Sequence, residues 1–361
     1  MKKFDHKVAV ILFNLGGPDK LKSVKPFLFN LFNDKAIISL PQPFRFLLAK
    51  LISSRREKKA QNIYKQIGGK SPILDITLSQ ADSLERELSF AGNFKVFTIM
   101  RYWHPFAQDV VKKINHYKPD EIILLPLYPQ FSSTTTASSV KNFIDNFDNK
   151  KIVKKIICCY PTQDNFIKSH AHQIIRVLKK VHIDDLPKIR LLFSAHGLPQ
   201  KVIDNGDPYV FQVEQSVTKI VELLNRSKIS AEFENFDLDY RICYQSKVGP
   251  LKWTTPSLEQ EIRSVSLDNK IPLIIPIAFV SDHSETLVEL DIEYKEMAEH
   301  LKIEQYYRVP ALNIDGHFIK SLKEMVLDVS ANSNNHIFCD GKAARICPKD
   351  YKLCPNLCPI N

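Results

Sequence analysis

The chain has 361 residues, of which 44% are hydrophobic and 25% charged, and its formal net charge at pH 7 is +10. This length suits two medium-sized domains, and the composition is that of an ordinary globular protein, which excludes a mainly disordered chain. The positive charge favours acidic partners. The sequence shows no zinc-finger spacing, RNA-recognition signature or basic-aromatic repeat, so a nucleic-acid-binding protein is not expected.

The start of the chain and its cysteines predict a cytoplasmic protein. Residues 1–7 are polar, and the apolar run Val8–Leu15 has the length of a strand, so no signal peptide is expected. No stretch reaches the roughly 18 apolar residues of a membrane span. In a reducing compartment the seven cysteines are expected to be free or metal-bound.

Short apolar runs alternate with longer amphipathic stretches. Most runs are rich in Ile, Leu and Val without alternation, which is typical of strands buried on both faces of a parallel sheet. The amphipathic stretches predict helices over Phe166–Val181, Pro208–Leu224 and Thr286–Leu301. The predicted strands are Val8–Leu15, Lys95–Met100, Glu121–Tyr128, Lys155–Cys159, Ile189–Ser194, Tyr240–Tyr244, Pro272–Phe279 and Tyr306–Val309. This order predicts a doubly wound α/β fold.

The strand–helix alternation runs twice along the chain. Val8–Pro18 opens the first half and Lys188–Pro199 the second, and each is an apolar strand that ends in a loop with Gly and Pro. We therefore predict two Rossmann-like domains with parallel sheets, one over 1–163 and one over 164–361 with a cysteine-rich tail. Such sheets bind ligands at the carboxyl ends of their strands, so both loops are expected to face one cleft.

The segment 37–59 departs from this alternation. It carries apolar residues and two prolines over Ile38–Ile52, followed by the basic residues Arg55, Arg56, Lys58 and Lys59. A buried helix with a solvated end is one explanation. The other is an apolar lip that touches an apolar ligand or lies peripherally on the inner face of a membrane. An apolar surface with a basic fringe suits the membrane–water interface.

A histidine stands at the carboxyl end of the predicted strand 189–194, in the run Ser194-Ala-His-Gly-Leu-Pro199. Gly197 permits a tight turn beside His196, and strand ends of this kind are where sites form. A neutral imidazole ligates a metal or accepts a proton near neutral pH. The alternative is a histidine that is only hydrogen-bonded within a turn.

A run of carboxylates follows the predicted strand 272–279. Asp282 and Glu285 have the spacing of a helix capping box, which is a purely structural explanation for both. Glu285, Glu289 and Glu293 are four residues apart, so one helix face carries three carboxylates. Such a stripe suits a hard cation or a proton relay, and a solvated acidic face is the alternative.

Most of the cysteines fall in two groups, one mid-chain and one near the C-terminus. Three terminal thiolates with one distant thiolate match the ligand number of an iron–sulfur cluster. Zinc is the competing metal, and free thiols are the remaining explanation. The two groups are Cys158 and Cys159, and Cys339, Cys347, Cys354 and Cys358.

Seven segments, in order, resemble those of the ferrochelatases, from Leu12 to about Asp328. Seven ordered matches are specific, whereas Ser-Ala-His alone is not. The segments are Asn14–Pro18, Ile67–Pro72, Met100–Pro105, Tyr128–Ser139, Phe193–Pro199, Tyr244–Pro250 and Pro276–Tyr294. The resemblance implies two Rossmann-like domains around a porphyrin, and an enzyme that inserts Fe²⁺ into protoporphyrin IX and releases two protons in the final step of haem biosynthesis.

The resemblance also implies roles for individual residues. It makes His196 and Glu285 the catalytic and metal-contacting pair, while Asp282, His283, Glu289 and Glu293 look like their supporting polar residues. The net positive charge favours the propionate groups of a porphyrin, with Arg101 and Lys247 as partners. Further residues that match positions around the macrocycle are Leu15, Tyr102, Tyr128, Ser132, Trp253 and Phe279.

The C-terminal cysteines resemble the ligands of the [2Fe–2S] cluster that some ferrochelatases carry. The resemblance implies Cys347, Cys354 and Cys358 as ligands, with Cys158 or Cys159 as the internal one. Zinc stays open as the competing metal.

Three other functions stay open beside iron insertion into protoporphyrin. Chelatases that insert cobalt or nickel share the fold and the histidine, but they are shorter and lack much of the patterns in Tyr128–Ser139 and Tyr244–Pro250. A coproporphyrin ferrochelatase would need cations for two extra propionates, and the apolar lip favours protoporphyrin. A haem or iron carrier needs no proton acceptor opposite a carboxylate stripe. The sequence predicts no oligomeric state.

Overall fold

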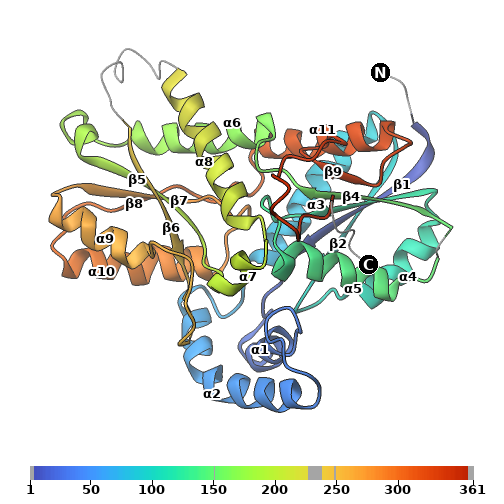
Figure 1. The fold of residues 1–361 in the computed structure, drawn as a ribbon, viewed down its shortest axis with the longest axis horizontal. Helices are drawn as coiled ribbons and strands as arrows, with labels where there is room; N and C mark the ends of the chain where they lie inside the picture. The colour runs from blue at the N-terminus through green and yellow to red at the C-terminus, as the bar shows by residue number, and fades with distance from the viewer. Residues whose placement is uncertain (1–3, 150, 227–237, 248, 357–361) are drawn as a thin grey trace.

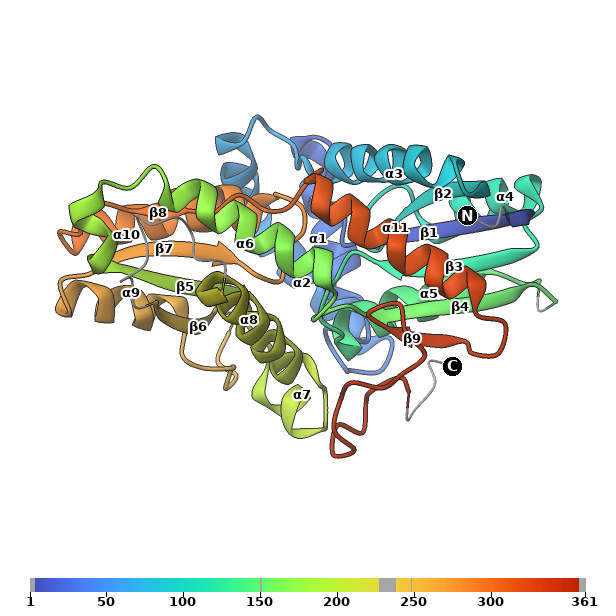
Figure 2. The ribbon, with the colours of Figure 1, turned by 90° about the horizontal axis from the view of Figure 1, so that it is seen from above.

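The structure is a computed structural model that describes residues 4–149, 151–226, 238–247 and 249–356. Two β-sheets lie end to end, with helices on both faces (Figures 1 and 2). Every registered strand pair is parallel. The predicted α/β class with parallel sheets is therefore confirmed.

The first sheet has the strand order β2-β1-β3-β4-β9. Its strands are β1 (Phe4–Asn14), β2 (Gly92–Met100), β3 (Glu121–Pro126), β4 (Val153–Cys159) and β9 (Ile337–Cys339). Alternate side chains of β1 leave on opposite faces. Val8, Val10 and Leu12 pack with α3 (Ile73–Ser89) and α11 (Gly316–Ala331), and Ala9 and Ile11 pack with α4 (Ala107–Tyr117) and α5 (Ser138–Asn146).

The second sheet has the strand order β6-β5-β7-β8. Its strands are β5 (Ile189–His196), β6 (Asp239–Gln245), β7 (Ile271–Pro276) and β8 (Tyr307–Arg308). Leu191 and Phe193 pack in one core with α6 (Asp164–Leu178) and α8 (Tyr209–Arg226), whereas Leu192 packs in a second core with α9 (Leu258–Leu267) and α10 (Tyr294–His300). The sheet is thus covered on both faces, which explains the uninterrupted apolar runs of its strands.

All eight predicted strands are present, and α6 and α8 match two of the predicted helices. The predicted helix Thr286–Leu301 is different, because Glu285–Glu293 forms a π-helix, η5, before α10 begins. Two backbone carbonyls of η5 find partners outside it. Gln245 Nε2 donates to the Glu285 carbonyl at 3.0 Å, and the Tyr306 hydroxyl donates to the Leu290 carbonyl at 2.7 Å.

The C-terminal segment departs from the predicted division into 1–163 and 164–361. β9 pairs in parallel with β4, so this short strand completes the first sheet. One continuous core also joins residues of both sheets through α6, α8 and α11. The C-terminal segment therefore rejoins the sheet formed by the first half of the chain. A strand of only three residues is too short to show a hydrophobic period, so the sequence does not predict β9.

The remaining elements include the helix pair α1 (Val24–Phe32) and α2 (Phe44–Gln66), which protrudes below the sheets in Figure 1. Val24, Phe27 and Tyr64 pack in a small core of this pair. No helix among the described residues has the length and hydropathy to cross a membrane. The short elements are η1 (Leu21–Ser23), η2 (Ser133–Ala137), η3 (Ile183–Lys188) and α7 (Gln200–Asp204).

Candidate active site

His196 and Glu285 face each other where two neighbouring strands of the second sheet end. His196 is the last residue of β5, and Glu285 opens η5 after the adjacent strand β7. His196 Nε2 lies 3.7 Å from Glu285 Oε1, and the two side chains are about one-third exposed, at 34% and 30%. The structure thus brings together a base and a carboxylate that are far apart in sequence, at the strand ends where α/β sheets hold ligands.

The His196 ring is oriented by its own backbone. Nδ1 lies 2.6 Å from the Gly197 carbonyl oxygen, which only accepts, so Nδ1 carries the proton of this hydrogen bond. In the neutral ring the lone pair is therefore on Nε2, the nitrogen that faces Glu285. Gly197 also allows the close approach of β6, because an added Cβ would meet the Gln245 carbonyl oxygen at 3.0 Å.

Glu285 does not take part in a capping box. The N-terminal flanking residue of η5 is Ser284, whose side chain makes no cap hydrogen bond. Glu285 Oε2 instead lies 3.4 Å from His283 Nε2, while His283 Nδ1 donates to the Ser281 carbonyl at 3.0 Å. Glu285 thus has one carboxylate oxygen toward each of two histidines.

The two histidines keep Glu285 ionised. Burial raises the pKa of the Glu285 carboxyl group, but the charge of His196 and the hydrogen bond from His283 outweigh burial and lower this pKa to about 2. Burial lowers the pKa of His283, yet the hydrogen bond to Glu285 prevails and raises it. At neutral pH the Glu285 carboxylate is therefore available to accept a proton or to ligate a cation.

Glu289, the second carboxylate of the stripe, lies against β6 and its following loop. Its oxygens accept hydrogen bonds from the Ser246 N–H at 2.9 Å, the Ser246 hydroxyl at 2.5 Å and Gln245 Nε2 at 3.2 Å. Burial and the neighbouring charge of Glu285 raise the pKa of Glu289. Glu293 is exposed at the end of η5. The stripe thus runs from two half-buried carboxylates outward to solvent.

Asp282 supports the site from behind. One of its carboxylate oxygens pairs with Arg308 Nη1 at 2.9 Å, and the other accepts from Asn313 Nδ2 at 2.8 Å. Arg308 Nε also pairs with Asp291 in η5 at 2.6 Å. Arg308 therefore links Asp282, three residues before Glu285, to the π-helix that carries Glu285. Sequence reasoning missed Arg308, because its partners are remote along the chain.

Three residues predicted to lie near a macrocycle stand close to this site. The Trp253 ring centroid lies 6.5 Å from that of His196, and the Phe279 centroid lies 4.9 Å from that of His283. Leu15 follows β1 and is partly buried. Its neighbour Asn14 reaches the segment after β7, with Nδ2 3.5 Å from the Ser281 hydroxyl. The loops after β1 and β7 therefore meet.

The other four predicted macrocycle residues are engaged inside the protein. Arg101 Nη2 pairs with Asp34 at 2.8 Å, and the Tyr102 hydroxyl donates to the same carboxylate at 2.9 Å. Tyr128 is buried, with its hydroxyl 3.5 Å from that of Ser139. Ser132 is fully buried and donates to Asp207 at 3.1 Å.

Full burial of Tyr102 and Ser132 leaves these two side chains no surface for a ligand in this conformation. Their prediction as macrocycle contacts is therefore not supported by their positions. The network around Asp34 was missed, as was Tyr64 of α2. The Tyr64 hydroxyl accepts from the Ser284 hydroxyl at 3.4 Å, so α2 contacts the residue next to Glu285.

A cysteine centre lies apart from this pair, at the end of β4. The Sγ atoms of Cys158, Cys159 and Cys339 all lie within 4.8 Å of one another. Cys347 and Cys354 of the tail are hydrogen-bonded to each other. Gln212 Nε2 donates to both Cys159 Sγ and Cys347 Sγ, at 3.4 and 3.1 Å, which joins the two groups. We call these five residues the cysteine centre.

The cysteine centre differs from the predicted ligand set in two respects. Cys339 belongs to it although it was not among the predicted ligands, because β9 brings it beside β4. Hydrogen bonds from Cys158 and Cys159 hold the pKa of Cys339 low, at about 4. Cys358 lies outside the described residues.

The lip predicted over 37–59 is exposed, which favours the surface interpretation over a buried helix. Phe44 is 65% exposed and Leu47 61%, and Leu51 lies on the same helical face one turn further along α2. The apolar side chains exposed in this lip are Ile37, Leu40, Phe44, Phe46, Leu47 and Leu51.

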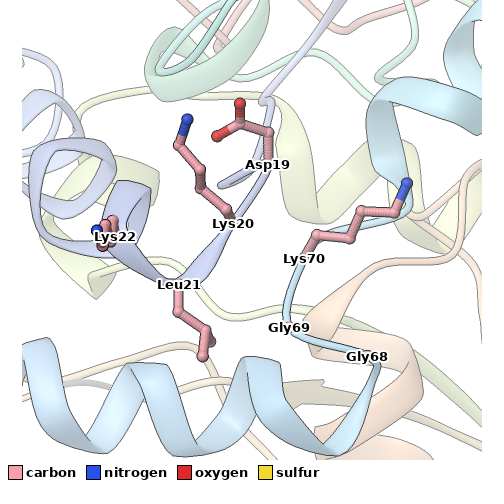
Figure 3. A pocket seen from close by; sticks show the side chains of 7 residues that line it. All are labelled: Asp19, Lys20, Leu21, Lys22, Gly68, Gly69 and Lys70. Carbon is pink, nitrogen blue, oxygen red and sulfur yellow. The ribbon is translucent and has the colours of Figure 1, made fainter.

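A surface pocket of about 570 Å³ lies elsewhere, between η1 and the turn after α2 (Figure 3). Its lining is Asp19, Lys20, Leu21, Lys22, Gly68, Gly69 and Lys70, none of which is a predicted site residue. Lys70 pairs with Asp75 at 2.8 Å. The pocket is therefore separate from the His196–Glu285 pair.

Known proteins resemble this chain over almost its whole length. A family model described as Ferrochelatase matches residues 7–329. The ferrochelatase of Rickettsia bellii (strain OSU 85-389) is 52% identical over 351 residues, which span 96% of this chain and 94% of that protein. The ferrochelatase of Pelagibacter ubique (strain HTCC1062) is 49% identical over 356 residues, spanning 97% of this chain and 99% of its own.

Among solved structures, SirB from Bacillus subtilis with Fe³⁺ resembles this one with a TM-score of 0.52. The match covers 91% of this chain and 97% of that one at 14% identity. At this identity the likeness concerns the fold alone, and it agrees with two sheets of Rossmann-like type.

Proposed function

The chain belongs to the ferrochelatase family and is an enzyme of haem biosynthesis that inserts ferrous iron into a porphyrin, and on this premise we propose that His196 and Glu285 carry the reaction. The single observation behind this assignment is the 3.7 Å approach of His196 Nε2 to Glu285 Oε1 at adjoining strand ends. Loss of free-base porphyrin fluorescence with ferrous iron, measured without oxygen in variants of either residue, tests it.

His196 is the proton acceptor in this proposal. Two pyrrole N–H protons must leave before iron can enter the ring plane, so the enzyme needs a base with an open lone pair. The hydrogen bond from Nδ1 to the Gly197 carbonyl leaves that lone pair on Nε2. With one-third of its side chain exposed, the imidazole is accessible to a ligand.

Glu285 supports the transfer by its charge. Its carboxylate is ionised at neutral pH, so it stabilises the imidazolium that forms when His196 gains a proton. The other oxygen of Glu285 contacts His283 Nε2. A proton that leaves His196 can therefore pass to the side of Glu285 that faces His283. Imidazole and carboxylate are also both ligands that iron accepts, so the same pair suits contact with the incoming ion.

Glu289 extends this arrangement with a different protonation preference. The pKa of Glu289 is raised whereas that of Glu285 is lowered. Two carboxyl groups whose pKa values are separated in this way can act as general acid and general base. We assign Glu289 the role of the proton carrier that passes the proton from Glu285 to solvent.

We further propose that the porphyrin is protoporphyrin, which has two propionates, and not coproporphyrin, which has four. Of the two cations predicted for propionates, Arg101 is engaged by Asp34, whereas exposed Lys247 makes no ion pair among the residues that the structure describes. Comparing initial rates with the two porphyrins, kcat/KM is expected to be roughly tenfold higher for protoporphyrin. Equal values, or a preference for coproporphyrin, would overturn this assignment.

We propose that the lip binds a membrane surface that contains anionic lipid. Its apolar face on α2 leads directly into Arg55, Arg56, Lys58 and Lys59, all of them exposed. Apolar insertion combined with attraction to anionic headgroups is the physical basis of such binding.

Replacement of Phe44 and Leu47 by serine is expected to lower binding to phosphatidylglycerol-containing vesicles about tenfold, because two exposed apolar side chains no longer insert. Co-sedimentation with the vesicles measures this. Leu267→Ser is the matched control, since Leu267 is 87% exposed on the second domain. Unchanged binding of the double variant would show that the lip is not the contact.

We also propose that the cysteine centre holds a [2Fe–2S] cluster. Five buried thiols of the described chain gather in this centre, and four thiolates satisfy such a cluster. Cys339, Cys347 and Cys354 with either Cys158 or Cys159 form the proposed ligand set. The cluster would supply a metal crosslink between β4, β9 and the tail.

Protein purified without oxygen is expected to be brown and to contain two iron and two sulfide ions per chain, as the cluster formula requires. Cys347→Ser is expected to lose the visible absorption, whereas Cys243→Ser, a buried cysteine in β6, keeps it. A colourless protein with one zinc ion and no sulfide would contradict the cluster.

A further inference from the structure

The first turns of α8 lie between the cysteine centre and His196. The helix begins at Tyr209, and its buried face carries Tyr209, Gln212 and Ser216, which recur every three or four residues. These side chains contact different parts of the protein. The start of α8 is therefore a rigid element that touches both the centre and the site.

Gln212 is fully buried and uses both ends of its side-chain amide. Nε2 donates to Cys159 and Cys347, while Oε1 accepts from the backbone N–H of Phe131 at 2.7 Å. No strand or helix bond satisfies this N–H, since Phe131 lies in the loop between β3 and η2. One side chain thus joins the cysteine centre to that loop.

The same loop is held at two further points, one in α8 and one just before it. The Ser216 hydroxyl accepts from Gln130 Nε2 at 3.0 Å. Asp207, two residues before α8, is fully buried and accepts from the Ser132 hydroxyl and from the Ser133 N–H at 2.7 Å. The loop after β3 therefore takes its position from α8.

The tail that carries Cys347 and Cys354 is packed on the same helix end. The Leu353 N–H donates to the Gly206 carbonyl at 3.1 Å, and the Phe211 and Tyr351 rings lie 5.2 Å apart. Gly206 has a φ of +93°, and an added Cβ would meet the Lys352 backbone nitrogen at 2.9 Å. Only glycine permits this close approach of tail and helix.

Tyr209 connects this helix end to the active site. It is buried one turn before Gln212, and its phenol is hydrogen-bonded to the backbone of His196. Its backbone N–H donates to Asp207 at 3.1 Å, so its position depends on the same short segment that contacts the tail.

We propose that Gln212 and Tyr209 are positioning residues, through which the cysteine centre and its tail hold the His196 backbone in place. The inference rests on the proposed roles of His196 and of the cysteine centre. Ordering of the tail fixes the segment Gly206–Gln212, and that segment fixes both the Phe131 loop and the strand end that carries His196.

Two substitutions distinguish the role of the Gln212 side-chain nitrogen from that of its oxygen. Gln212→Glu keeps an oxygen that accepts from Phe131 but loses the N–H donors to sulfur, whereas Gln212→Leu loses both. Both variants are expected to change the visible spectrum of the cluster, because hydrogen bonds to sulfur tune it. Only Gln212→Leu is expected to speed hydrogen exchange at the Phe131 amide, about tenfold or more. Gln215→Leu, on the same helix, is the matched control.

The connection to His196 is tested by kinetics. Tyr209→Phe is expected to lower kcat several-fold, with KM for porphyrin and the cluster spectrum unchanged. If the two residues act in series, adding Gln212→Leu to Tyr209→Phe lowers kcat by less than about twofold further. Full multiplication of the two single losses would show that they act independently and would overturn the proposal.

Gly206→Ala gives a second route that alters no cysteine and neither proposed residue. It is expected to speed exchange in the tail, in residues 207–213 and at the end of β5, and to leave α9 unchanged. Faster exchange confined to the tail would also overturn the proposal. Absence of iron and sulfide from the wild type would instead refute the cluster, and full activity of a His196 variant would refute the role of that residue.

Discussion

Replacement of His196 by alanine is expected to slow iron insertion roughly 10²- to 10⁴-fold, the range that a positioned general base contributes. Alanine removes Nε2, which is the nitrogen that faces Glu285 and carries the lone pair. Because one-third of the His196 side chain is exposed, the loss of packing is small, and thermal unfolding should be nearly unchanged.

The assay for this variant follows free-base porphyrin fluorescence with ferrous iron under anaerobic conditions. His116→Ala is its control, since His116 is an exposed histidine in the last turn of α4. A His196→Ala enzyme that keeps a rate near that of the wild type would refute the assignment. A variant that unfolds at a much lower temperature would show a structural role in place of the chemical one.

Glu285→Gln is expected to slow insertion about 10²-fold or more, although glutamine has almost the same shape. The amide carries no charge to stabilise the protonated His196, and it offers a proton no acceptor of comparable basicity. Since the Glu285 pKa is lowered to about 2, the wild-type carboxylate stays ionised throughout pH 5–8. The loss in the variant should therefore be nearly constant over that range.

Glu293→Gln is the matched control for Glu285→Gln, because Glu293 lies on the same π-helix but is exposed at its far end. Its rate is expected to stay within about twofold of the wild type. If both variants lose the same activity, the stripe acts only through its summed negative charge, and the specific role of Glu285 is wrong.

The position of the site was predictable from the sequence because the strands themselves are predictable. Runs such as Ile189–Ser194 are mostly apolar and are buried on both faces, since helices cover both sides of the sheet, and this pattern is local. The ends of such strands then indicate where His196 and Glu285 lie. Their distance apart depends on the adjacency of β5 and β7, which the sequence does not state.

The π-helix was not predictable, because its cause is remote. A four-residue spacing of carboxylates fits an α-helix equally well. The wider helix is accommodated by Gln245 and Tyr306, which donate to two of its carbonyls from other elements. The same reasoning applies to Ser132 and Tyr102, whose buried partners Asp207 and Asp34 lie far away in the chain.

The central claim is that His196 and Glu285 act as one unit in iron insertion. It is tested most directly by the insertion rate of the double variant His196→Ala/Glu285→Gln, compared with the two single variants. Groups that act together show grossly non-additive losses, so the double variant is predicted to be about as slow as the slower single variant. A rate lowered by the full product of the two single losses would contradict a shared role.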